Sequence, residues 1–98
     1  MTLDQFGTVI KSADPAAAHY AGKGTGNYTR WYEYDLGDNG GKSGPMKIQV
    51  DHFTKLENDP VVTGITEALN LDDVYAKHLV DFEPDTGYIH HIWDCEVT

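Results

Sequence analysis

Residue types that bind metal ions or attack substrates gather near the end of the chain. His90, His91, Asp94 and Cys95 lie close together. Neighbouring side chains of a β-strand point to opposite faces, so His90 and His91 cannot hold one ion together. A zinc site would need a ligand from another strand, such as His52. We therefore expect no metal site here, with one of the two adjacent histidines packed in the sheet and the other exposed.

Cys95 is the one thiol of the chain, and His91 is a conceivable base for it. A reactive cysteine needs an electropositive setting that lowers its pKa, whereas its neighbours here are Asp94 and Glu96. We expect a buried, inert thiol. The remaining candidate carboxylates are scattered over strand faces, and nothing singles out a pair for acid–base work: Glu33, Asp35, Asp51 and Asp81. The sequence predicts neither an enzyme nor a cofactor.

Two glycine-rich segments superficially resemble nucleotide-binding loops. Gly40-Gly41-Lys42-Ser43 looks like the end of a phosphate-binding loop, but Leu36 stands where that motif needs its first glycine. Gly22, Gly24 and Gly26 have the wrong spacing for a dinucleotide fingerprint. We interpret both segments as connectors.

The apolar pattern predicts an α+β domain in the order α-β-β-β-α-β-β. Thr2 and Gln5 match a capping box at the start of the first helix, and Asp14-Pro15 ends it. Asn58-Asp59-Pro60 starts the second helix, with proline at its first position. Expected helices cover 2–13 and 58–73, and expected strands cover 16–21, 28–36, 46–55, 74–83 and 88–97. Antiparallel hairpins with both helices on one face then form a single domain over residues 1–98.

The strand over 28–36 alternates in a way that divides its side chains between two faces. Tyr28, Tyr32 and Tyr34 share one face with Arg30, and Trp31 lies on the other. The strands carry more aromatic residues than one covered sheet face holds easily. Either the tyrosines sit half-exposed on the open face, or that face packs on a neighbouring subunit, since aromatic residues anchor interfaces.

The charge balance and the N-terminus limit the possible partners. The chain has 98 residues and a net charge of −9, from 16 acidic and 7 basic residues. Such a surface repels phosphates, so ordinary DNA or RNA binding is not expected. We expect no signal peptide, because basic and apolar leader regions are missing, and no membrane span. The charge serves solubility, or it faces a basic partner or DNA that slides past.

The linear order of three segments resembles small tail-terminator and head–tail joining proteins of tailed phages. The segments are Tyr32-Glu33-Tyr34, then 49–55 as Gln-Val-Asp-His-Phe-Thr-Lys, then the acidic turn and aromatic–histidine stretch over 83–90. The resemblance covers nearly the whole chain, and its motifs are loose structural patterns. His52 departs from the second motif, and the glycine-rich loop after Asp35 has no assignable role.

The resemblance implies a structural virion protein, assembled in the host cytoplasm, without enzyme activity. Such proteins form a hexameric ring that caps the tail tube, stops its polymerisation and offers a docking face to head completion (stopper) proteins, while DNA passes through the channel. A ring needs one patch to meet a different patch. For one patch we expect a strand edge or the aromatic face, with these contact residues: Tyr28, Arg30, Trp31, Tyr32, Tyr34 and Phe53. The loop expected to reach the tube or a neighbour contains Gly37, Asp38, Asn39 and Lys42.

A second class of function also fits the composition. A small acidic inhibitor, such as an immunity protein or a DNA mimic, would bind a basic partner in a tight one-to-one complex. Mimicry of DNA calls for acidic side chains on one face at a regular spacing, whereas these are spread over loops and both strand faces.

Overall fold

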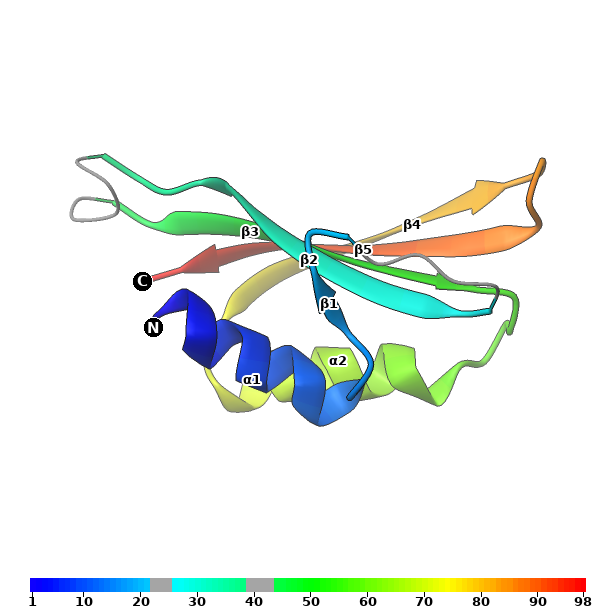
Figure 1. Cartoon of the computed structure of the whole chain (residues 1–98), viewed down its shortest axis with the longest axis horizontal. Coiled ribbons are helices and arrows are strands. Elements are labelled where there is room, and N and C mark those ends of the chain that lie inside the picture. The colour runs from blue at the N-terminus through cyan, green and yellow to red at the C-terminus, as the bar shows by residue number, and fades with distance from the viewer. Residues whose placement is uncertain (22–25, 39–43) are drawn as a thin grey trace.

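The computed structural model describes residues 1–21, 26–38 and 44–98. The element order confirms the predicted α+β arrangement, and Figure 1 shows both helices on the same side of the sheet. The elements are α1 (Leu3–Ala13), β1 (Ala18–His19), β2 (Tyr28–Asp35), β3 (Met46–Thr54), α2 (Pro60–Leu71), β4 (Tyr75–Glu83) and β5 (Tyr88–Val97). The glycine-rich segments at 22–25 and 40–43 lie outside the described residues.

Local capping explains where both helices begin. Thr2 and Gln5 form the predicted capping box, with each side chain satisfying the other's backbone N–H. Asp59 caps α2 by accepting from the backbone N–H of Val61 at 2.9 Å, and Pro60 occupies the first helical position. These contacts are local in sequence, so the residues at each helix start are enough to explain where the helix begins.

The strand order in the described part of the sheet is β1-β2-β3-β5-β4. β2, β3, β5 and β4 pair antiparallel in that order, whereas β1 pairs parallel with β2. The first strand is shorter than the expected 16–21, because Tyr20 adopts a positive φ of 70° that breaks the extended backbone. β4 therefore forms one outer edge, and the two-residue β1 covers only part of the other.

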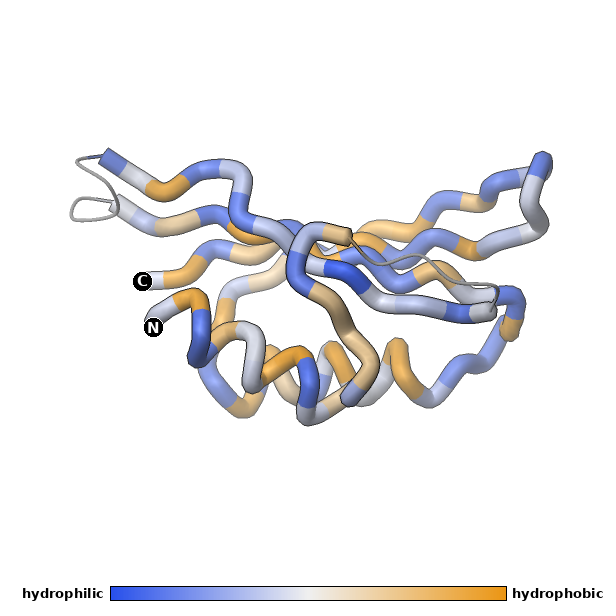
Figure 2. Tube along the Cα trace, in the orientation of Figure 1, coloured by the Kyte–Doolittle hydropathy of each residue, from blue (hydrophilic) through white to orange (hydrophobic). Residues whose placement is uncertain are grey.

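The hydrophobic core lies between the sheet and the two helices. Trp31, Ile48, Val50 and Trp93 face the helices from three neighbouring strands, and Phe6 and Ile10 of α1 pack toward them. Figure 2 shows hydrophobic segments of both helices directed toward the sheet. Gly7 belongs in α1 despite its poor helix propensity, because a Cβ there would lie 2.9 Å from the Trp31 ring.

The hairpin of β4 and β5 extends past the end of the helix layer (Figure 1). Its turn uses Gly87 with a φ of 77°, as the Pro84-containing turn sequence predicts. Near the tip, side chains on the helix-facing side of β4 find no helix beneath them, and Val80 and Phe82 are exposed. None of the helices in the described residues is long and apolar enough to cross a membrane.

Candidate self-association surface

The open face of the sheet is built around Phe53 of β3. Its ring stacks on Tyr28 with centroids 4.6 Å apart and on His90 at 4.1 Å, and the Arg30 guanidinium lies 5.2 Å from its centre. These contacts leave Phe53 only 5% exposed. The chain therefore covers part of its own aromatic face without a neighbouring subunit.

Asp51 of β3 holds several side chains of this face in place through hydrogen bonds. The side chain is fully buried, and its carboxylate accepts from Arg30 Nε at 3.0 Å, Gln49 Nε2 at 2.9 Å and His90 Nε2 at 2.8 Å. A buried carboxylate is tolerated when several donors surround it. The contacts tie β2, β3 and β5 together on the side of the sheet that the helices do not cover.

The structure places the six expected interface residues in three different settings. Trp31 is 4% exposed in the helix-covered core, so it and Phe53 offer almost no surface to a neighbour. Tyr28, Arg30 and Tyr32 are half-buried. Tyr34 is 49% exposed and donates its hydroxyl to Asp94, a hydrogen bond that raises the Tyr34 pKa to about 12.

Only part of the expected contact loop belongs to the described structure. Gly37 has a φ of 79°, a conformation that favours glycine, and its N–H donates to the Asp35 carboxylate at 2.9 Å. Asp38 follows it at the end of the described segment. Asn39 and Lys42 lie outside the described residues, so the loop stays an expectation.

Most of the large hydrophobic side chains that are exposed on the described strands lie on β4 instead. Its large exposed side chains are Tyr75 (69%), Leu79 (43%), Val80 (60%) and Phe82 (59%). The sequence predicts the strand and its alternation, and a strand edge is one expected interface, but the position of β4 at the edge depends on long-range pairing. The mixture of apolar residues with Lys77 and Asp81 is a weak signal of an edge strand.

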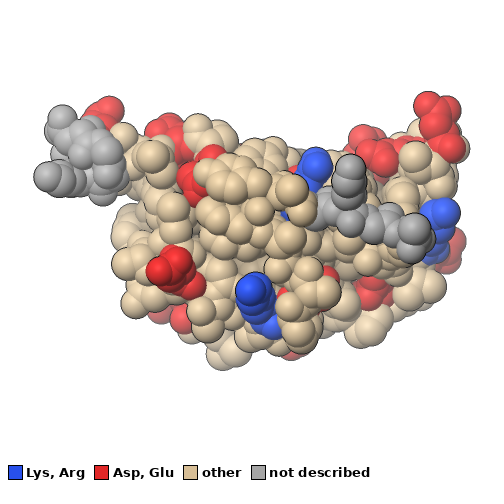
Figure 3. Space-filling view, in the orientation of Figure 1, with Lys and Arg blue, Asp and Glu red and all other residues tan. Residues whose placement is uncertain are grey.

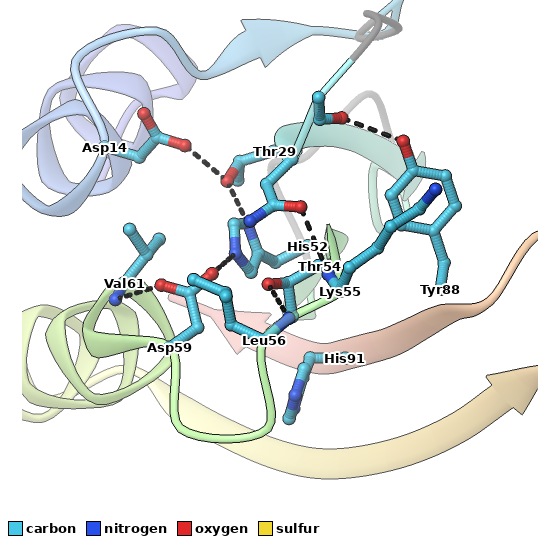
Figure 4. A network of polar contacts seen from close by, with 12 residues as sticks. Asp14, Thr29, His52, Thr54, Lys55, Leu56, Asp59, Val61, Tyr88 and His91 are labelled. Carbon is cyan, nitrogen blue, oxygen red and sulfur yellow. Dashed lines mark hydrogen bonds and ion pairs between the residues drawn. The ribbon is translucent and has the colours of Figure 1, made fainter.

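A buried polar chain joins the two helices to the sheet on the covered side (Figure 4). The Thr29 hydroxyl donates to Asp14 at 2.6 Å and lies 2.7 Å from His52 Nδ1, while His52 Nε2 lies 2.7 Å from Asp59 Oδ2. Thr29 and His52 are each 1% exposed. Thr29, His52 and Asp59 superficially resemble a hydrolase triad, but the Thr29 hydroxyl belongs to a buried side chain and donates to Asp14. The role of this polar chain is to fasten α1, β2, β3 and α2 together.

Asp59 is the carboxylate at the α2 end of these polar contacts, and Asp14 is the one at the α1 end. Burial by itself raises the pKa of Asp59, but hydrogen bonds from the His52 side chain and the Val61 N–H outweigh it, and the net shift is downward. The carboxylate form is thus the one the fold stabilises.

The adjacent histidines point to opposite faces, as the sequence predicts, yet both are half-buried rather than one packed and one exposed. His90 reaches Asp51 on the open face. His91 lies on the helix side, where its Nδ1 is 2.9 Å from Nε2 of His78, and the His78 ring stacks on Trp93. Within residues 1–21, 26–38 and 44–98, no group of three or more His, Cys, Asp or Glu side chains is placed to hold a metal ion.

The His78–His91 contact predicts that acid destabilises the protein. Partial burial lowers the pKa of the half-buried His91 and of the more exposed His78 below 6.5, so the unfolded chain binds protons more readily than the native one. The two neutral histidines make their full contribution to the free energy of unfolding above pH 6.5. This contribution should fall as the pH drops from 6.5 toward the native pKa values. Urea unfolding between pH 8 and pH 5 tests this, with His78→Gln as the comparison. A variant with the same pH slope as the unmodified chain would contradict the assignment.

Cys95 is fully buried in the core, and burial, followed by the nearby Asp94 charge, raises its pKa to about 12. This confirms the expected buried thiol and leaves it without nucleophilic character at neutral pH.

Comparison with known proteins identifies no relative. No protein-family model matches the chain, and neither a curated protein nor a solved structure does.

Proposed function

We propose that this chain is a structural virion subunit, which caps a phage tail tube as a ring, stops its polymerisation and joins tail to head. The observation that carries the proposal is the exposure of large hydrophobic side chains on both faces of β4: Tyr75 on the open face, and Val80 and Phe82 on the helix-facing side, are each more than half exposed. Several large hydrophobic side chains exposed on one strand of a small protein support a contact with another macromolecule. Copies of the same chain are the partner that an assembly protein always has available.

The three segments of the family resemblance lie together on the sheet. Tyr32-Glu33-Tyr34 lies on β2, residues 49–55 include most of β3, and residues 83–90 comprise the end of β4, the turn and the start of β5. The resembling segments therefore belong to the sheet and its hairpin tip, and the helices cover only one face of that sheet. This supports a role in which the sheet makes the contacts.

The charge distribution is compatible with a channel for DNA. The net charge is −9, and acidic groups outnumber basic ones on the face drawn in Figure 3. Negative walls do not release counterions from DNA phosphates, so DNA passes without being held. A ring of such subunits would repel the genome along its path rather than bind it.

Light scattering and electron microscopy with polymerising tail tube protein test the proposal. We expect the chain to bind tube ends as a ring, with a hexamer as the expected size, and to shorten the tubes in proportion to its concentration. Tube protein polymerised alone is the control. Tubes of unchanged length with no chain at their ends would overturn the tail-terminator role, and a one-to-one complex with a basic protein would favour the inhibitor class.

A further inference from the structure

The outer edge of β4 is long enough to pair with another strand. β4 covers nine residues and pairs with β5 on one side, and no described residue pairs with its other side. An edge strand presents a row of unpaired N–H and C=O groups that can extend a sheet into another chain. Backbone groups and apolar side chains are thus available along the same line.

The sequence of β4 is complementary to itself when two copies run antiparallel. With the two-fold axis at Leu79, Lys77 of each copy stands opposite Asp81 of the other, which gives two ion pairs. On the same face, Tyr75 stands opposite Glu83, whose carboxylate can accept from a phenol. On the helix-facing side, the register opposes Ala76 to Phe82 and His78 to Val80. Ala76 leaves room for Phe82, and Lys77 faces the opposite charge of Asp81.

Neighbouring registers lose this match. A shift by one residue exchanges the two faces of one strand, so covered and open sheet faces would be joined. Centring the axis on Val80 places Leu79 opposite Asp81, and centring it on His78 places Lys77 opposite Leu79. Of these three registers, only the one centred on Leu79 satisfies two conditions. It places Lys77 opposite a carboxylate, and it places no charged residue opposite a leucine.

The other edge of the sheet is a poorer partner for β4. β1 already pairs with β2 at Arg30 and Trp31, and the Tyr20 N–H donates to the Trp31 carbonyl at 2.7 Å. This occupies the middle of the β2 edge. Among the described strands, a continuous pair of the full length of β4 is therefore available only from another β4.

We propose that two copies of this chain form a two-fold dimer by antiparallel pairing of β4 with β4 about Leu79, which joins their sheets into one. The contact uses the same patch on both copies, so it closes at two subunits. A ring on a tail tube needs two different patches. The dimer thus goes beyond the proposed function: it forms without tube protein, and its failure leaves the ring test unchanged.

Charge exchange across the axis gives the decisive experiment. We expect sedimentation equilibrium of the unmodified chain to show a concentration-dependent dimer. Lys77→Asp and Asp81→Lys, each alone, create two like-charge contacts and should weaken the dimer by about tenfold or more. The double variant restores both pairs, and so does an equimolar mixture of the two single variants. Both side chains lie on the surface, so we expect each variant to fold, and circular dichroism checks this.

A monomer at every concentration up to about 1 mM would overturn the proposal, as would single variants that dimerise normally or a mixture that does not recover.

Disulfide formation tests the register independently. Facing Cα atoms of an antiparallel pair lie about 4.5–5.5 Å apart, within disulfide range. Leu79→Cys should therefore crosslink two copies under mild oxidation. Phe82→Cys is the matched control, exposed but far from the axis, and equal crosslinking by both variants would reject this register.

Discussion

Replacing Asp59 with alanine is expected to lower the free energy of unfolding by about 2–4 kcal/mol, because it removes a helix cap and leaves a buried imidazole without its hydrogen-bond partner. Asp59 is 7% exposed and serves two elements with one carboxylate. One oxygen caps α2 through the Val61 N–H, and the other meets the buried His52 ring. Alanine removes both contacts and leaves the imidazole without its acceptor. Chemical denaturation at pH 7 measures the loss.

Asp59→Asn is the matched control, because an amide oxygen still caps the helix but carries no charge. We expect Asp59→Asn to lower the free energy of unfolding by less than Asp59→Ala does. The difference between native chain and alanine variant should also shrink as pH falls below 3.8, because a lowered pKa stabilises only above the unfolded value and is lost in acid. A loss under about 1 kcal/mol for Ala at pH 7 would mean that the cap alone matters and that His52 finds another partner.

Trp93→Ala is expected to cost about 3–5 kcal/mol, the usual range for removing a buried aromatic side chain. Trp93 is 1% exposed on β5, the strand between β3 and the edge strand β4. Its ring stacks on His78 at 4.6 Å, and its indole N–H donates to Thr66 Oγ1 of α2 at 3.1 Å. The cavity would open between sheet and helix, where the surrounding elements are held by other contacts and cannot collapse.

Trp93→Phe separates packing from hydrogen bonding, because it keeps an aromatic ring and removes the donor. We expect its loss to be clearly smaller than that of alanine, on the order of 1–2 kcal/mol. Urea unfolding followed by far-ultraviolet circular dichroism gives both values. If Phe and Ala destabilise equally, the hydrogen bond to Thr66 rather than the packed ring dominates at this position.

The element order and the side-chain faces could be predicted because they depend on short-range chemistry. A capping box at Thr2, the Asp59-Pro60 start of α2 and the period of two along β2 and β3 are all local signals. They place Ile48 and Val50 on the core side and Asp51 on the other. The same alternation puts His90 and His91 on opposite faces, as the register of β5 confirms.

The strand order and the polar contacts could not be predicted, because they join residues that no local pattern links. Only the weak signal of Lys77 and Asp81 indicates that β4 lies at an edge, and nothing near β1 indicates that it pairs parallel to β2. Phe53 looks available on an alternating strand, yet Tyr28 and His90 cover it from two other strands. Asp59 can be recognised from the sequence as a helix cap. Its contact with the buried ring of His52 cannot, because it depends on how the segment between β3 and α2 folds.

The carboxylate of Asp51 has a consequence for anything that settles on the open side of the sheet. Free arginine and glutamine side chains sample many rotamers, and freezing each costs about 0.5–1.5 kcal/mol on association. Arg30, Gln49 and His90 are already held by Asp51 before a partner arrives. These side chains are already ordered in the folded chain, so a partner that binds this face would lose less side-chain entropy on association.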